Sequence, residues 1–123
     1  ANPNKFFERV IRSRARIGTL LMDQSVVAGI GNIYRTELLW RQGIHPNTIG
    51  KDMNISQLED LWKDARTLLE VGVMRNKIIT KFKKSGRAFK ESLNIYKKKK
   101  CPSCKGEILK MEISGRVAYF CAY

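Results

Sequence analysis

The chain has 123 residues, and its 24 Lys and Arg residues against 11 Asp and Glu residues give a net charge of +13. This length suits one domain or a domain with a small module, and the excess of positive charge indicates a nucleic-acid-binding protein. No segment is apolar over the roughly 20 residues of a membrane-spanning helix, and no secretory signal is visible. The three cysteines are an odd number, which argues against a disulfide framework. We therefore expect an intracellular protein, in the cytoplasm or nucleoid, with no membrane partner.

The first part of the chain predicts short helices. Asn2 and Pro3 suit the cap and first turn of a helix, and apolar residues with helical spacing follow over 6–11. A second helical stretch over 17–21 runs up to the polar and glycine-rich run Asp23–Arg35.

The run Asp23–Arg35 predicts a phosphate-binding device. If a helix ends at Gly29–Gly31 and the next helix begins at Asn32, backbone N–H groups and the Asn32 amide face outward at a helix N-terminus, where phosphates bind. The new helix continues through Trp40 and stops at Gly43. The plain alternative is that Asn32 only caps this helix.

The middle of the chain predicts a long amphipathic helix. Ser56–Glu59 has the pattern of a capping box. Apolar residues then recur with helical spacing, which predicts core packing, at Leu58, Leu61, Trp62, Ala65, Leu68, Leu69 and Gly72. Beyond Arg75 a basic segment with interleaved aromatics, residues 81–90, is either a nucleic-acid contact or a solvated loop. Leu93–Tyr96 alternates like a short strand.

The C-terminal cysteines have the spacing of a zinc ribbon. Cys101 and Cys104 form a CxxC knuckle, and sixteen residues separate Cys104 from Cys121. Two strands joined by a turn at Ser114–Gly115 are expected between the knuckles, over residues 107–113 and 116–120. So short a hairpin buries little core, so a tetrahedral zinc ion is needed to stabilise it.

The second knuckle of a zinc ribbon requires Cys-x-x-Cys, but Cys121 is followed here only by Ala122 and Tyr123. The fourth ligand would stand at position 124, and a truncated sequence is the simplest explanation. Otherwise the three thiolates need water, a histidine or another chain as the fourth ligand. His45, the single histidine, follows a distant helix end and is a poor candidate. A redox CxxC fits less well, because no βαβ pattern surrounds it.

These motifs together resemble one known family. Leu20–Tyr34 resembles the helix–two-turn–helix signature of the formamidopyrimidine-DNA glycosylase/endonuclease VIII family, and Glu37 and residues 43–46 continue the match. Residues 115–121 resemble the zinc-finger hairpin of that family, so the resemblance covers nearly the whole chain. It implies a mainly α fold with three parts: a helix–two-turn–helix domain over 1–80, a basic loop and connector over 81–97, and a zinc finger over 98–123 that is truncated at its last ligand.

The resemblance also implies which residues bind DNA and metal. Gly31 and Asn32 would bind backbone phosphates near a lesion, and Arg116 would hold a phosphate at the flipped nucleotide. The zinc ligands would be Cys101, Cys104 and Cys121. The implied partner is double-stranded DNA with damaged bases or abasic sites, bound by a monomer. Alternatively, Arg116 is a solvated strand residue.

Two departures from the family pattern stand out. Catalysis in this family uses the amine of an N-terminal proline and a following Glu, whereas this sequence begins Ala1-Asn2-Pro3. We therefore expect no catalytic residue here, but the C-terminal DNA-binding part of a bifunctional DNA glycosylase/AP lyase for oxidised bases, inactive without its N-terminal catalytic domain. Gly18 stands where many relatives of the 8-oxoguanine branch carry Lys, and Arg35–Glu37 is more typical of the endonuclease VIII branch.

The sequence also fits two other functions. A non-enzymatic ribosomal or other RNA-binding zinc-ribbon protein would carry the same positive charge. A self-sufficient lyase would need a different amine as its nucleophile, such as a lysine or the amine of Ala1.

Overall fold

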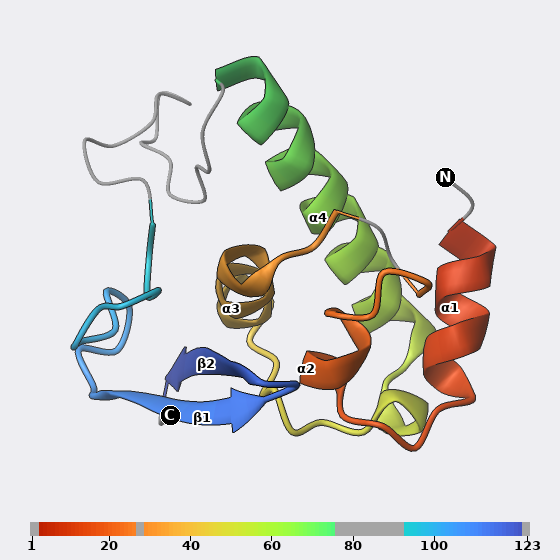
Figure 1. The fold of residues 1–123 in the computed structure, drawn as a ribbon, viewed down its shortest axis with the longest axis horizontal. Helices are drawn as coiled ribbons and strands as arrows, with labels where there is room; N and C mark the ends of the chain where they lie inside the picture. Colours follow the sequence, from red (N-terminus) through yellow and green to blue (C-terminus); the bar gives the residue numbers. More distant parts are fainter. Residues whose placement is uncertain (1–2, 27–28, 76–92, 122–123) are drawn as a thin grey trace.

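The computed structural model describes residues 3–26, 29–75 and 93–121. These residues form a helical part followed by a small antiparallel hairpin, as expected (Figure 1). The helices are α1 (Pro3–Ile11), α2 (Ile17–Leu20), α3 (Asn32–Arg41), the short 3-10 helix η1 (Gly50–Asp52) and α4 (Ile55–Arg75). The strands are β1 (Ile108–Ile113) and β2 (Arg116–Cys121). Helix α3 packs against α4 on one side and β2 on the other.

One hydrophobic core fills the helical part. All four α-helices and the turns between them contribute to it, and each fully buried aliphatic or aromatic side chain stabilises the fold by about 1.5–3 kcal/mol. Its most buried members are Phe6, Val10, Ile17, Leu21, Ile30, Leu38, Leu58, Leu61 and Leu68. The apolar stripe predicted on the long helix faces this core. Trp62 is partly buried and packs against Phe6 of the core, with ring centroids 5.2 Å apart, as its place on the stripe predicted.

The start of α4 corrects the predicted capping box. Asn54 Oδ1 accepts a hydrogen bond from the Gln57 backbone N–H at 2.8 Å, and Gln57 Oε1 accepts one from the Asn54 N–H at 3.0 Å. The box is therefore Asn54–Gln57, and the prediction of Ser56–Glu59 was wrong. Burial of apolar side chains places the start of the helix here: Met53, just before the cap, and Leu58 both lie in the core, as in a hydrophobic staple. A cap at Ser56 would put the 46 % exposed Ile55 in that role.

Between α2 and α3, the described residues 21–26 and 29–31 form turns and irregular structure rather than a helix. Helix α2 ends at Leu20, so the expectation that a helix ends at Gly29–Gly31 was wrong. The Gln24 side chain holds the last turn together: its Oε1 accepts the Gly29 N–H and its Nε2 donates to the Ile30 carbonyl, both at 3.0 Å. Helix α3 nevertheless begins at Asn32, as predicted.

The hairpin has the predicted turn. Ile113 pairs with Arg116, and the two residues between them, Ser114 and Gly115, have φ angles of 56° and 75°. Positive φ at both positions is the geometry of a type I′ turn, whose twist matches that of the strands. The basic segment 81–90 lies outside the described residues. In the described ranges, no helix has the length and apolar character to cross a membrane.

The capping box gives a testable prediction. Asn54→Ala should lower the free energy of unfolding by about 1 kcal/mol, because it leaves N–H groups of the first turn of α4 without an acceptor. Urea denaturation followed by circular dichroism measures this change. Ser56→Ala is the matched control and should change stability by less than about 0.5 kcal/mol. A larger loss for Ser56→Ala than for Asn54→Ala would contradict this assignment.

Candidate functional site

Helix α3 buries a polar face. Asn32, Arg35, Thr36 and Glu37 are all buried, and Arg35 and Glu37 have no exposed surface. Each of these side chains bonds to the C-terminal segment that contains the hairpin. We call this set of four residues the polar face of α3. Buried polar groups need partners of this kind, because each unpaired one costs about 1–3 kcal/mol.

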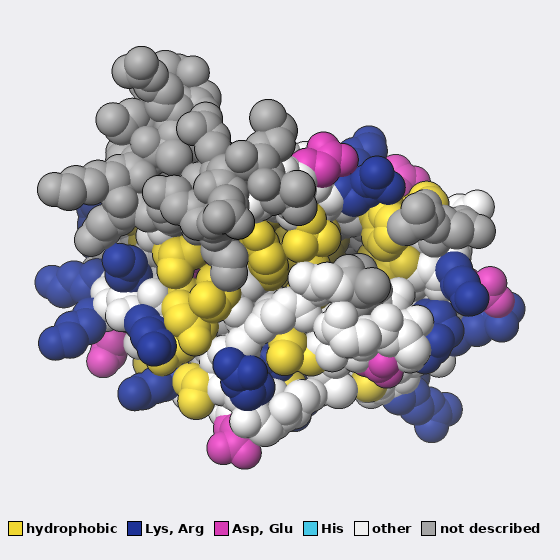
Figure 2. Space-filling model, turned by 45° about the horizontal axis from the view of Figure 1, so that its top comes forward, with side chains coloured by type: hydrophobic (Ala, Val, Ile, Leu, Met, Phe, Trp, Pro, Cys, Tyr) yellow, Lys and Arg dark blue, Asp and Glu magenta, His cyan; other side chains and the backbone are white. Residues whose placement is uncertain are grey.

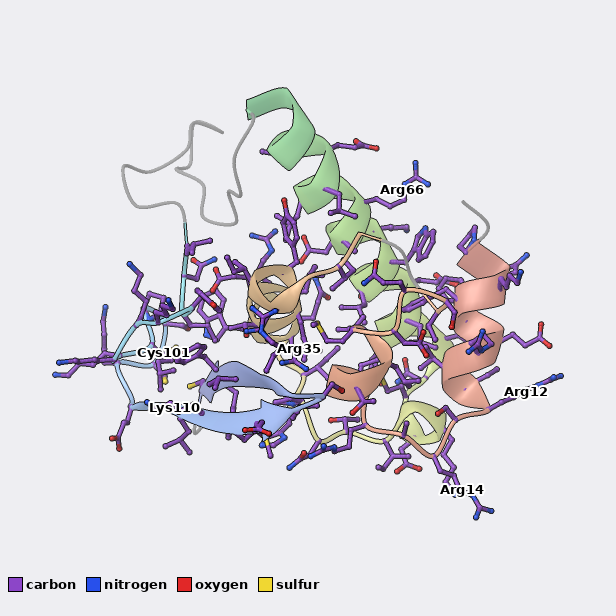
Figure 3. The ribbon with its side chains drawn as sticks, in the orientation of Figure 1. Arg12, Arg14, Arg35, Arg66, Cys101 and Lys110 are labelled. Carbon is purple, nitrogen blue, oxygen red and sulfur yellow. The ribbon has the colours of Figure 1, made fainter. Side chains whose placement is uncertain are left out.

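Arg35 is the central member of the polar face (Figure 3). Its Nη1 donates to the carbonyl oxygens of Gly18 at 3.1 Å and Ile113 at 2.9 Å. Its Nη2 donates to Asn32 Oδ1 at 2.5 Å and to the Arg116 carbonyl at 3.1 Å. Ile113 and Arg116 are the pair that closes the hairpin turn, so Arg35 joins α2, α3 and that turn.

Asn32 does not cap α3. The N-cap residue is Gly31, which is exposed, and Asn32 is the first helical residue. The Asn32 amide is buried, where the sequence predicted an exposed one: its Nδ2 donates to the Val117 carbonyl at 2.7 Å and its Oδ1 accepts from Arg35. The physical reason is that the hairpin packs over the Asn32 side chain, whereas the preceding Gly31 stays exposed. Arg116 lies beside it, with an exposed side chain.

Glu37 binds the segment that precedes the cysteines. Its carboxylate accepts the backbone N–H groups of Asn94, Ile95 at 2.7 Å and Tyr96 at 2.9 Å. Three successive N–H groups on one carboxylate require a bend, and residues 94–97 form bends and turns. The predicted strand Leu93–Tyr96 was therefore wrong, because these N–H groups bond to a side chain and not to a neighbouring strand.

The three cysteines meet as the spacing predicted. The sulfur atoms of Cys101, Cys104 and Cys121 all lie within 4.8 Å of one another, close enough to hold one metal ion. Within the described ranges His45 is not part of this cluster. Its Nδ1 accepts the Asn47 N–H at 3.0 Å, and its ring packs on Phe120 with centroids 4.8 Å apart.

Cys101 is in a setting that favours its thiolate. Burial alone would raise the pKa of Cys101, but hydrogen bonds from the backbone of Cys104, the Trp40 indole and the backbone of Ser103 lower this pKa to about 7. The indole Nε1 of Trp40, on α3, lies 3.2 Å from the Cys101 sulfur. Thiolates are the form of cysteine that binds metals, so α3 also supports the candidate metal site.

The surroundings of the polar face are positively charged. Burial and the charges of Arg116 and Arg16 all lower the pKa of Arg35. Figure 2 shows Lys and Arg side chains at both ends of one face of the molecule, with acidic side chains interspersed among them. With a net charge of +13 over the whole chain, an anionic ligand is favoured over a cationic one.

Comparison with known proteins agrees with this geometry. Residues 1–84 match the family described as the formamidopyrimidine-DNA glycosylase H2TH domain, where H2TH stands for helix–two-turn–helix. The chain is 35% identical over 129 residues to endonuclease 8 1 of Mycobacterium tuberculosis, covering 98% of this chain and 48% of the relative. It is also 35% identical over 126 residues to the formamidopyrimidine-DNA glycosylase of Mycoplasma pneumoniae, covering 98% and 46%.

Solved structures give the same result. A complex of Lactococcus lactis Fpg with DNA containing an abasic site superposes with a TM-score of 0.82 at 28% identity, covering 98% of this chain and 46% of that one. A complex of the same protein with DNA containing N7-benzyl-Fapy-dG also has a TM-score of 0.82. The chain thus spans just under half the length of these relatives.

The bonds of Glu37 can be tested by an isosteric change. Glu37→Gln should lower the free energy of unfolding by about 2 kcal/mol, because an NH₂ group would replace one of the oxygens that accept backbone N–H groups. Urea denaturation measures the loss. Glu112→Gln, at an exposed position on β1, is the control and should stay within about 0.5 kcal/mol of the parent. Equal stabilities of the two variants would refute the role of Glu37.

Proposed function

We propose that this chain, which belongs to the formamidopyrimidine-DNA glycosylase/endonuclease VIII family, binds double-stranded DNA that contains damaged bases or abasic sites. The observation that carries the proposal is the junction at the start of α3. Gly31 and Arg116 are both exposed there, and each precedes a residue of the bond that joins the Asn32 amide to the Val117 carbonyl, while Arg35 bonds to the Arg116 carbonyl. The L. lactis complexes with abasic-site and damaged-base DNA support it.

Each proposed contact suits a phosphate. The N–H groups of the first turn of α3 have no partner within the helix and attract an anion. The guanidinium of Arg116 can bind two oxygens of one phosphate. Asn32 adds the second hydrogen of its Nδ2 group, since the first is taken by the Val117 carbonyl. Contacts of this kind position DNA without reading its bases.

We propose zinc as the metal of the three cysteines. Thiolates are preferred zinc ligands, and three of them fill three positions of a tetrahedral site. Cys101 and Cys104 come from one knuckle and Cys121 from the end of β2, so the ion would tie the knuckle to the hairpin. The ion would be structural, and these residues would form a zinc ribbon that carries Arg116.

We propose the same organisation that the family resemblance implies: a helix–two-turn–helix domain over 1–80, a connector over 81–97 and a zinc finger over 98–123. The full-length relatives are DNA glycosylases and endonucleases by name. We assign this chain the DNA-binding role within such an enzyme, acting on oxidised bases, with the nucleophile and general acid supplied by a further, N-terminal catalytic domain. A ribosomal or other RNA-binding role is not favoured by these relatives.

The DNA-binding proposal predicts a salt-dependent affinity. The chain should bind a duplex with a tetrahydrofuran abasic-site analogue, and the logarithm of its affinity should fall linearly with the logarithm of salt concentration, by about 0.9 per phosphate contact. Arg116→Ala should weaken binding and reduce this slope by about 1. Fluorescence anisotropy across a salt series measures both quantities.

Arg66→Ala is the control for the loss of one positive charge, because Arg66 is exposed on α4 and away from the hairpin (Figure 3). An undamaged duplex and a structured RNA are the competitors. Binding that does not change with salt, or a preference for the RNA, would overturn the proposed function.

The metal proposal predicts about one zinc ion per chain. Cys104→Ser should release most of this zinc, whereas Ser103→Ala, in the same knuckle, should retain it, because an alanine at 103 removes no ligand. Elemental analysis after dialysis measures the metal content. Removal of zinc by a chelator should also change tryptophan fluorescence, because the Trp40 indole donates to the Cys101 sulfur. Equal zinc content in the two variants would contradict the assignment.

A further inference from the structure

The buried guanidinium of Arg35 has almost all of its hydrogen-bonding capacity committed. An arginine has five N–H donors, and the four on the two Nη atoms donate to Gly18, Ile113, Asn32 and Arg116. In the described part of the chain, Arg35 Nε is the one buried side-chain polar atom with no partner. All four acceptors are uncharged oxygens, so the bonds satisfy the donors but do not neutralise the charge.

In the described ranges, the charge of Arg35 has no acidic counter-ion. Among the described residues no carboxylate forms an ion pair with Arg35, and the neighbouring charges that act on it, Arg116 and Arg16, are also positive. A buried charge without an acidic partner is unfavourable for folding alone. An anion at the adjacent surface would relieve this repulsion, and the adjacent surface is the proposed phosphate site.

Two of the four acceptors of Arg35 belong to residues of this site, and the other two lie next to it in the hairpin turn and in α2. Its Nη2 bonds to the side chain of Asn32 and to the backbone of Arg116. Its Nη1 bonds to the backbone of Ile113, on the other side of the hairpin turn, and of Gly18 in α2. The guanidinium is planar and rigid, so it fixes these groups relative to one another.

We infer that Arg35 is a positioning residue of the phosphate site: it orients the Asn32 amide and the turn that carries Arg116, and its charge adds to theirs. The inference rests on the proposed DNA binding. Arg35 has no exposed surface, so it does not touch the DNA itself. It acts through Asn32 and Arg116, which distinguishes it from an arginine that serves stability alone.

The test is a double-mutant cycle for binding to the duplex with the tetrahydrofuran abasic-site analogue. Arg35→Met should weaken binding by about tenfold or more, which is the effect of losing one charge-assisted hydrogen bond. Arg66→Met removes one positive charge from an exposed position on α4 and should weaken binding less than Arg35→Met does. In the variant with both Arg35→Met and Arg116→Ala, the loss should be at least about threefold smaller than the product of the single losses, because both act on one site.

The conservative variant separates position from charge. Arg35→Lys keeps the charge but offers three donors from a point instead of a planar fork. It should bind more tightly than Arg35→Met, but more weakly than the parent, with a salt slope close to that of the parent. Circular dichroism and zinc content verify that each variant is folded. If Arg35→Met does not fold, the cycle of Arg35→Lys with Arg116→Ala decides in its place.

Two failures are distinguishable. If the parent chain does not bind the duplex, the proposed function falls, and this inference with it. If the parent binds but the Arg35 variants match Arg66→Met, or their losses multiply with that of Arg116→Ala, Arg35 has a structural role alone. The positioning role is supported if the losses of affinity from the Arg35 and Arg116 variants do not multiply and Arg35→Lys restores part of the binding.

Discussion

The polar face of α3 is the interaction on which the arrangement of the C-terminal segment depends. The hairpin has few buried apolar side chains of its own: Ile108, Ile113 and Ala118. So small a core does not fix its position on the helical part. The hydrogen bonds from α3 fix the position of the hairpin instead, because each bond requires a defined geometry. Breaking one would leave a buried polar group unpaired.

Helix α3 therefore aligns three features along about 15 Å, the length of ten helical residues. At its N-terminus Arg35 and Asn32 hold the hairpin turn. In the middle Glu37 holds the bend at Asn94–Tyr96. Near its C-terminus Trp40 donates to Cys101. A helix anchored in the main core thus sets the distance between the proposed phosphate site and the proposed metal site.

The sequence predicts those features whose residues lie close together along the chain. The apolar stripe of α4, the turn at Ser114–Gly115 and the meeting of the cysteines each follow from the spacing of residues close together in the chain. All three are present in the structure. The sequence alone does not reveal the polar face of α3, although Arg35–Glu37 resembles one branch of the family. Its partners in the C-terminal segment lie 57 to 85 residues away along the chain, and no local pattern shows whether a polar helix face meets water or protein.

The errors have the same origin. Asn32 was expected at the surface because an amide at a helix N-terminus suits a phosphate, and only the distant hairpin makes it buried. The expected strand at Leu93–Tyr96 fails because the Glu37 carboxylate takes the N–H groups that a strand would offer to a neighbour. In both cases a long-range bond overrides a local preference, and in both cases α3 provides it.

Two unusual positions, Gly18 and Arg35, prove to be one structural feature. The Gly18 carbonyl accepts from Arg35 at 3.1 Å, as does the Ile113 carbonyl at 2.9 Å. A Cβ atom at position 18 would lie only 3.0 Å from Ile113 Cδ1 and 3.1 Å from the Pro46 carbonyl. The absence of a side chain at Gly18 thus lets the hairpin approach α2 closely enough for Arg35 to bond to both. Any side chain at position 18 would crowd this close approach of the hairpin to α2.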